Sequence, residues 1–124
     1  SRHHLHCTAS GKAILANLPE ERVDEILEQH GLPAYTDDTI TDRSTLLDEL
    51  EDVRATGVAF VDGEWAEEIR AVASPVVRED EVIGAVTLGA PKKRLSGTYF
   101  RDELPNVVSG AVSRLELSFQ KRAL

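Results

Sequence analysis

The chain has 124 residues and 41% hydrophobic content, which suits one domain with an ordinary core. No apolar run approaches the ~20 residues of a membrane span, and the first residues lack a signal-peptide pattern. We therefore expect a soluble, cytoplasmic domain that does not contact membranes. The formal charge of −8 argues against direct contact with nucleic acid phosphates, which normally requires a basic patch. An acidic surface also keeps proteins solvated in high salt, and it suggests a halophilic source.

Histidines and the only cysteine open the chain, at His3, His4, His6 and Cys7. We expect no metal site, because no second ligand cluster, C-x-x-C or H-E-x-x-H follows them. Cys7 has no partner for an internal disulfide, which agrees with a reducing compartment. A lone buried cysteine is typically inert.

The stretch TASGKAILANL predicts a short helix capped by Thr8 or Ser10. It is not a phosphate-binding loop, because Ala13 follows Lys12 where that loop needs a hydroxyl. The N–H groups at its start still suit a carboxylate, so this turn is a candidate wall of a pocket. The side chains expected to pack inward are Ala13, Ile14 and Leu18.

Two further helices are predicted within residues 19–31 and 42–57, and the glycine that closes each range, Gly31 or Gly57, is expected to stop the helix. Thr41 or Asp42 is expected to cap the second of these helices. Apolar residues recur at helical spacing in both. The first stripe comprises Val23, Ile26, Leu27 and His30, and the second comprises Leu46, Leu47, Leu50 and Val53.

From Val58 the pattern changes to short strands separated by the polar corner VDGEWAEE. Asp62 and Glu64 in this corner could form an acid and base pair. A solvated turn is the simpler interpretation on an acidic protein, and we expect no catalytic residues. A small hydrolase or transferase that uses these carboxylates or Cys7 is the least favoured function.

Residues 71–91 predict a β-hairpin with its turn in the charged tetrad Arg78–Glu81. In the second strand Val82, Gly84, Val86 and Leu88 share one face, which is mostly bulky, whereas Ile83, Ala85, Thr87 and Gly89 share the other, which is mostly small. Two interpretations stay open: the small face leaves room for a ligand, or it lets a helix pack closely.

A long helix is predicted from about Thr98, with Pro105 kinking or restarting it. This order of helices and strands indicates an α+β fold, an antiparallel sheet with helices against it. The stripe expected to face the sheet or a partner comprises Leu104, Val107, Val108, Ala111, Leu115 and Phe119.

Three blocks together resemble the C-terminal effector-binding domain of IclR-type transcriptional regulators. They are LHCTASGKAILANLP, TITDRSTLLDELEDVRATG and ASPVVREDEVIGAVTLGAP, and they cover nearly the whole chain. The resemblance implies a GAF-like or profilin-like antiparallel sheet flanked by helices, in a dimer or tetramer that binds a small organic acid or related metabolite. It implies no cofactor. It also implies that residues 1–124 are a single effector domain truncated at its N-terminus, without the winged helix-turn-helix domain that would bind DNA.

By position, the resemblance assigns the effector pocket to Ala9, Ser10, Asp62, Ala71, Thr87 and Gly89. The family often has cysteine where this chain has Ala71 and serine where it has Thr87 and Gly89. The less polar residues here favour a larger or more apolar effector than glyoxylate. The leading hypothesis is a non-enzymatic sensor whose ligand alters operator affinity. The alternative is a dimerisation or interaction module with a vestigial pocket.

Overall fold

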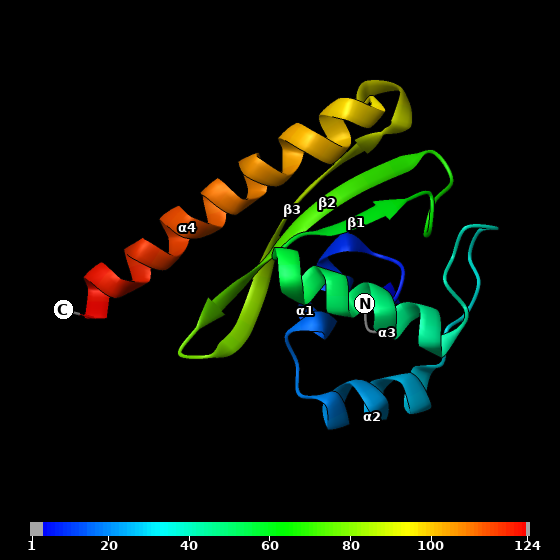
Figure 1. Ribbon diagram of the computed structural model, residues 1–124, viewed down its shortest axis with the longest axis horizontal. Coiled ribbons are helices and arrows are strands. Elements are labelled where there is room, and N and C mark those ends of the chain that lie inside the picture. Colours follow the sequence, from blue (N-terminus) through cyan, green and yellow to red (C-terminus); the bar gives the residue numbers. More distant parts are fainter. Residues whose placement is uncertain (1–3, 124) are drawn as a thin grey trace.

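The computed structural model describes residues 4–123, which form four α-helices and a three-stranded antiparallel sheet. The helices are α1 (Ala9–Ala16), α2 (Glu20–His30), α3 (Arg43–Thr56) and α4 (Leu104–Ala123), and the strands are β1 (Ala59–Asp62), β2 (Ile69–Arg78) and β3 (Glu81–Pro91). A 3-10 turn η2 (Lys92–Arg94) and a π-helical segment η3 (Tyr99–Glu103) connect β3 to α4. The predicted α+β class is confirmed (Figure 1).

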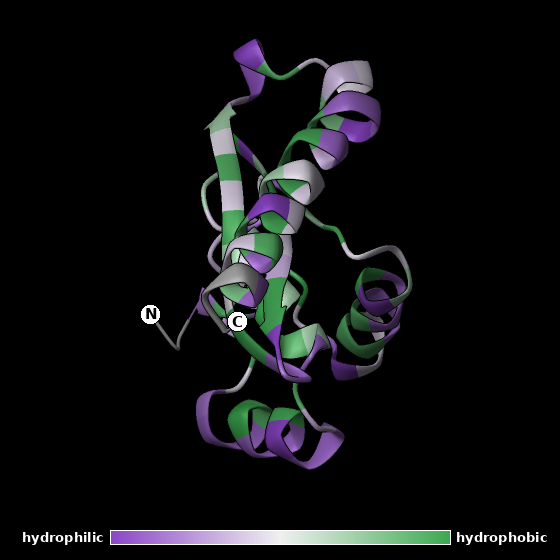
Figure 2. Ribbon diagram, turned by 90° about the vertical axis from the view of Figure 1, so that its left-hand side faces the viewer, coloured by the Kyte–Doolittle hydropathy of each residue, from purple (hydrophilic) through white to green (hydrophobic). Residues whose placement is uncertain are grey.

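The sheet has the order β1-β2-β3, and the predicted hairpin forms its larger part. Glu79 and Asp80 make the two-residue turn at positive φ, 53° and 67°. Ala73 lies opposite Thr87, and Val72 lies opposite Leu88. Near the turn, a bulge shifts this register between Val76 and Val77. As predicted, Ala85 and Val86 pack on opposite faces of the sheet. Figure 2 shows the hydropathy alternating along β3.

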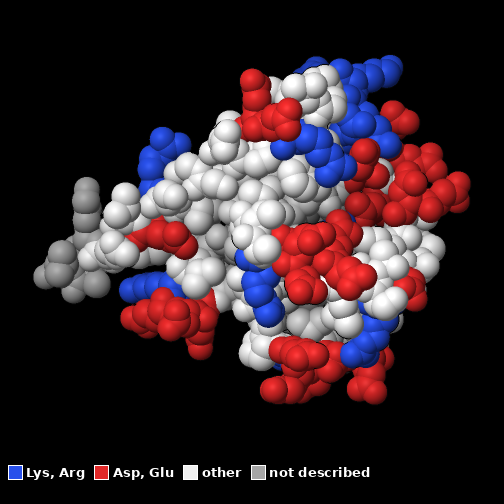
Figure 3. Space-filling model, viewed as in Figure 1, with Lys and Arg blue, Asp and Glu red and all other residues white. Residues whose placement is uncertain are grey.

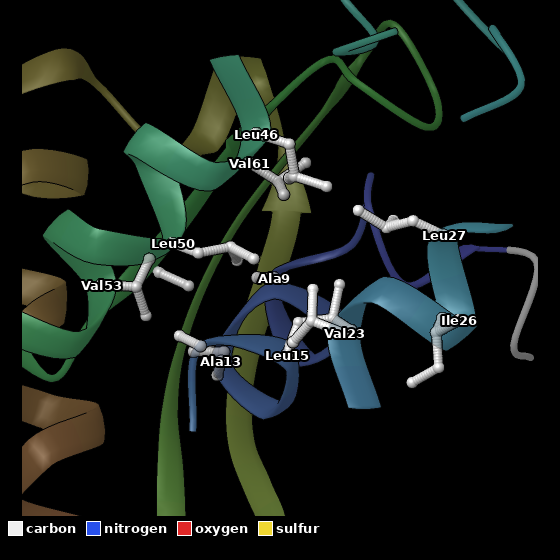
Figure 4. Packing of buried hydrophobic residues seen from close by; sticks show 13 residues of the cluster. Ala9, Ala13, Leu15, Val23, Ile26, Leu27, Leu46, Leu50, Val53 and Val61 are labelled. Carbon is white, nitrogen blue, oxygen red and sulfur yellow. The ribbon is translucent and has the colours of Figure 1, made fainter. Parts of the chain in front are cut away.

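Helix α1 packs on the small face of the sheet with α3 beside it, α2 lies on the side of these helices away from the sheet, and α4 covers the bulky face (Figure 1). On this side of the sheet, apolar side chains of the three helices form one cluster with β1 and with Ala73 of β2, in which Leu46 lies beside Val61 and Val23 lies beside Leu15 (Figure 4). On the bulky face, Val72 packs with Phe100, Leu104 and Val108. The tight approach of α1 to the alanines of β2 shows that the small face does serve helix packing.

Local signals at the helix ends act as predicted. Thr8 Oγ1 accepts a hydrogen bond from the Gly11 N–H at 3.2 Å, and Asp42 Oδ2 accepts one from the Thr45 N–H at 3.0 Å. Gly57 ends α3 in the left-handed region with φ 78°. These caps satisfy N–H groups that the first helical turn leaves without partners.

Two predicted packing faces are partly wrong. In α1, Leu15 and Lys12 are buried, whereas Ile14 and Leu18 are only half-buried. The buried face differs from the predicted one because α3 and the corner after β1 also contact this short helix. In α4, Val107 and Leu115 are 48% and 42% exposed, and Val112 is buried in their place. The inward face of α4 drifts round the helix because α4 runs along a twisted hairpin. The restart at Pro105 is confirmed: a π-helical segment precedes α4 there.

Candidate functional site

A cavity of about 180 Å³ lies between the start of α1, the corner after β1, and the small face of β2 and β3. None of the described residues that line it is charged. Three contribute hydroxyl groups and one a thiol, and the others are apolar. The lining comprises Cys7, Thr8, Ala9, Ser10, Val61, Trp65, Ala66, Ile69, Ala71 and Thr87.

Four of the six predicted pocket residues lie together on this cavity: Ala9, Ser10, Ala71 and Thr87. They come from three elements, and the register that places Ala73 opposite Thr87 brings Ala71 beside them. None of the six predicted pocket residues lines the hollow between α1, α2 and α3 or the hollows near the hairpin turn. The small face thus leaves a cavity beyond the part that α1 covers.

Asp62 and Gly89 do not line the cavity. Asp62 Oδ1 instead accepts from Arg70 Nε and Lys92 Nζ, both at 3.1 Å. Burial alone would raise the pKa of Asp62, but these two cations together hold it below its usual range. Gly89 is exposed opposite Ala71, where an added Cβ would lie 3.4 Å from the Ala71 Cβ. Asp62 is therefore engaged at the sheet edge.

The first turn of α1 forms one wall of the cavity. Thr8 Oγ1 donates to the His4 carbonyl at 2.8 Å, which holds the preceding segment over the helix. Gly11 permits this close approach, because a Cβ there would lie 2.4 Å from the Leu5 carbonyl oxygen. The N–H groups of Ala9 and Ser10 have no partner within the helix. Together with the hydroxyls of the lining, they suit a carboxylate.

Lys12 is fully buried behind this wall, a placement that was not predicted. Its ammonium donates to Glu64 Oε1 at 2.6 Å, Glu49 Oε1 at 2.9 Å and the Phe60 carbonyl at 3.1 Å. All three of its protons therefore have acceptors. Ala9, Lys12 and Ala16 are spaced three and four residues apart, so they lie on the same face of α1. This spacing was the signal in the sequence that could have placed Lys12 on the inward face.

The electrostatics of this region favour binding over catalysis. Burial raises the pKa of Glu64, and the adjacent Lys12 ammonium offsets part of that shift. Burial, with added repulsion from Glu64, raises the pKa of the Cys7 thiol to about 11, so the thiol stays protonated at neutral pH. Asp62 and Glu64 each hold a cation and are not a free acid and base pair.

The described part of the chain places no three His, Cys, Asp or Glu side chains together to hold a metal ion. His3 lies outside it. His6 Nε2 is 2.8 Å from the Pro33 carbonyl, and burial lowers the pKa of His6. This histidine is thus engaged in packing the opening segment.

Trp65, Ala66 and Ile69 line the cavity but were not predicted. All three belong to the corner or to the start of β2. Trp65 was the signal in the sequence that could have indicated this part of the lining, since a large aromatic side chain in a polar loop is typical of a binding surface.

Acidic side chains cover much of the visible surface, with a group of basic ones near the start of α4 (Figure 3). None of the described helices combines the length and apolar character needed to cross a bilayer.

Comparison with known proteins agrees with this architecture. The family profile described as "Bacterial transcriptional regulator IclR C-terminal" matches residues 1–116. The chain is 34% identical to the probable HTH-type transcriptional regulator ArcR of Halobacterium salinarum over 94% of its own length and 44% of that protein. It is 34% identical to the transcriptional repressor IclR of Escherichia coli over 74% of its own length and 34% of that protein. The chain thus spans less than half the length of these curated relatives.

Among solved structures, the fold is similar to the inducer-binding domain of the PobR transcription factor from Acinetobacter, a double mutant in complex with 3-hydroxybenzoic acid. The TM-score is 0.85 at 28% identity, over 90% of this chain and 65% of that one. These relatives are transcriptional regulators and repressors rather than enzymes. The chain belongs to the IclR C-terminal family of bacterial transcriptional regulators.

Proposed function

We propose that this domain binds a small organic acid in the cavity lined by Ser10 and Thr87, with a compact apolar body against Ala71 and Ile69. The observation that carries the proposal is the convergence of four predicted pocket residues on one uncharged cavity beside the start of a helix. The N–H groups of Ala9 and Ser10 and the two hydroxyls would hold the carboxylate. We do not include Asp62 or Gly89 as direct ligands, because they lie off the lining.

The size and polarity of the cavity favour a single-ring acid over glyoxylate. An apolar cavity of ~150 Å³ is large enough for benzene, and this one measures about 180 Å³. Apolar contacts from Val61, Ala66 and Ile69 would favour a ring, whereas a two-carbon acid leaves most of this surface unfilled. The acid that the PobR domain holds, 3-hydroxybenzoic acid, is of this class.

In a longer regulator, the bound acid would change the affinity of a separate DNA-binding domain for its operator. This domain itself carries a net charge of −8, so DNA contact is assigned to the other domain. A coupling free energy of about 1–3 kcal/mol would change operator affinity roughly 5–150-fold. Fluorescence anisotropy with labelled operator DNA, with and without the acid, measures this factor. Equal affinities would contradict the coupling.

A thermal-shift screen of the chain tests the binding step. Glyoxylate, pyruvate, benzoate and 3-hydroxybenzoate would be compared at equal concentration, with uncharged benzamide as a control for the acid group. We expect the two aromatic acids to raise the melting temperature, glyoxylate to raise it less, and benzamide to leave it unchanged. If no acid raises the melting temperature, the binding proposal is wrong.

The second candidate, a dimerisation module with a vestigial pocket, has its own supporting observation. Val107, Leu115 and Leu117 of α4 are 48%, 42% and 56% exposed, and Leu88 of β3 is 40% exposed. Apolar groups of this kind suit a contact with a second copy, in a homodimer or tetramer. Light scattering distinguishes the candidates: a dimer unaffected by every acid, but lost in Leu115→Glu/Leu117→Glu, would favour the module over the sensor.

A further inference from the structure

Trp65 lies between two hollows. On one side is the 180 Å³ cavity, and on the other a groove of about 450 Å³ beside the opening segment and α1. Thr8 and Ser10 line both, as Trp65 does. The remaining lining of this outer groove is His4, Leu5, Gly11 and Ile14. Only the width of a few side chains therefore separates the two spaces.

The backbone on the N-terminal side of Trp65 is firmly held. The Glu64 carboxylate pairs with buried Lys12 at 2.6 Å. The Glu64 carbonyl accepts a hydrogen bond from Thr39 Oγ1, and the Gly63 carbonyl accepts one from Thr36 Oγ1 at 2.6 Å. Three interactions, which join α1 and the α2–α3 connection to the β1–β2 corner, thus fix the position from which the indole projects.

Backbone hydrogen bonds also hold the loop on the C-terminal side of Trp65. The Gly63 N–H donates to the Ile69 carbonyl at 2.9 Å, and the Ile69 N–H donates to the Ala66 carbonyl at 3.1 Å. The Trp65 side chain, by contrast, is 48% exposed and meets the His4 ring edge-on, with 5.3 Å between ring centroids. Removing the indole therefore leaves the loop supported, because none of these hydrogen bonds uses it.

We propose that the Trp65 indole is the partition that limits the size of the ligand. It confines a bound acid to the inner cavity, and without it the inner cavity and the outer groove become one longer site. This inference rests on the proposed function, because it assumes that an acid binds in the inner cavity. Ser10, one of the groups assigned to the carboxylate, borders both spaces, so the acid can still be held when the partition is removed.

Isothermal titration of the chain with benzoate and with 2-naphthoate tests the partition. Wild type should bind benzoate at least about tenfold more tightly than 2-naphthoate, since a rigid second ring has no room in the inner cavity. In Trp65→Ala, the ratio of the two affinities should shift by at least about tenfold toward 2-naphthoate. Trp65→Phe keeps a ring at this place, and it should keep the preference for benzoate.

Tyr99→Ala is the matched control. Tyr99 is an aromatic residue of comparable exposure, 40%, and it lies in η3 away from both hollows. Its removal should leave the affinity ratio unchanged. Trp65 is the only tryptophan of the chain, so its fluorescence provides a second readout. Benzoate should change the wild-type emission and reduce its quenching by acrylamide.

The outcomes separate this inference from the function on which it rests. If benzoate binds wild type but the affinity ratio is the same in Trp65→Ala, the partition is wrong and the proposed function stands. If wild type binds 2-naphthoate as tightly as benzoate, the partition is wrong as well. If neither acid binds wild type or either variant, the proposed function fails and the partition fails with it.

Discussion

The Lys12 ammonium lies 2.6 Å from the Glu64 carboxylate, joining α1 to the corner that carries Trp65. Lys12 is completely buried and Glu64 is 9% exposed, so neither charge is well solvated. An ion pair in such a place is expensive to break, because the group left behind remains buried and charged. The pair thus connects both sides of the candidate cavity.

Replacement of Lys12 by methionine tests this connection. We expect Lys12→Met to lower the free energy of unfolding by about 3–5 kcal/mol, because Glu64 loses its cation. Arg22→Ala is the control, since it breaks the exposed pair with Glu25 and should cost about 0–1 kcal/mol. Urea unfolding followed by circular dichroism measures both changes. Equal, small losses would show that the buried pair does not stabilise the fold.

Gly11 and Gly110 provide a matched pair of helical glycines. Gly11→Ala should destabilise the domain by more than about 2 kcal/mol, because its Cβ would meet the Leu5 backbone at 2.4–2.5 Å. Gly110 has open space around it in α4, so Gly110→Ala should stabilise the domain by roughly 0.5–1 kcal/mol. Melting temperatures should move in opposite directions. A stabilised Gly11→Ala would contradict the packing of the opening segment on α1.

The hairpin turn holds two non-glycine residues in the left-handed region, at Glu79 and Asp80. A two-residue turn of this type prefers glycine at its second position. Asp80→Gly should therefore raise the free energy of unfolding by about 0.5–1 kcal/mol. Asp80→Ala removes the same carboxylate without relieving the backbone, so it should give no such gain. Chemical denaturation of both variants checks the difference, and equal gains would assign the effect to charge.

Cys7 gives a pH dependence with a defined sign. Its pKa is raised from 9.0 to about 11 in the folded chain. The folded state therefore holds the thiol proton more tightly than the unfolded state does. The contribution of this thiol to the free energy of unfolding is fully present below pH 9 and is lost as the pH rises toward 11. Relative to wild type, Cys7→Ala should lose less stability between pH 9 and pH 11. Parallel losses in both proteins would contradict the raised pKa.

Residues 71–91 show why much of the fold was predictable. Alternation in a strand and the charged turn are local signals, and they correctly placed Ala85 and Val86 on opposite faces. The caps Thr8 and Asp42 are equally local, because each bonds an N–H three residues on. In α4, by contrast, Val107 and Leu115 are exposed because the orientation of the helix depends on the twist of a hairpin far away in sequence.

The site was predictable only where position along a strand or turn decides the outcome. Ala9, Ser10, Ala71 and Thr87 meet at the cavity, and their assignment to a ligand remains a prediction. The placement of Asp62 depends on Arg70 across the strand pair and on Lys92 beyond β3. No local pattern could show that both cations converge there. Helical spacing could place Lys12 on the inward face of α1, but it could not show the three acceptors of its ammonium, which lie 37 to 52 residues away.

The most direct test of the account is a calorimetric titration of benzoate into wild type and into Ser10→Ala/Thr87→Val. Because the two hydroxyls are assigned to the carboxylate, we expect the double variant to bind at least about tenfold more weakly. Thr41→Val/Ser113→Ala removes two exposed hydroxyls elsewhere and should bind like wild type. Unchanged affinity in the first variant, or no binding to wild type, would contradict the account.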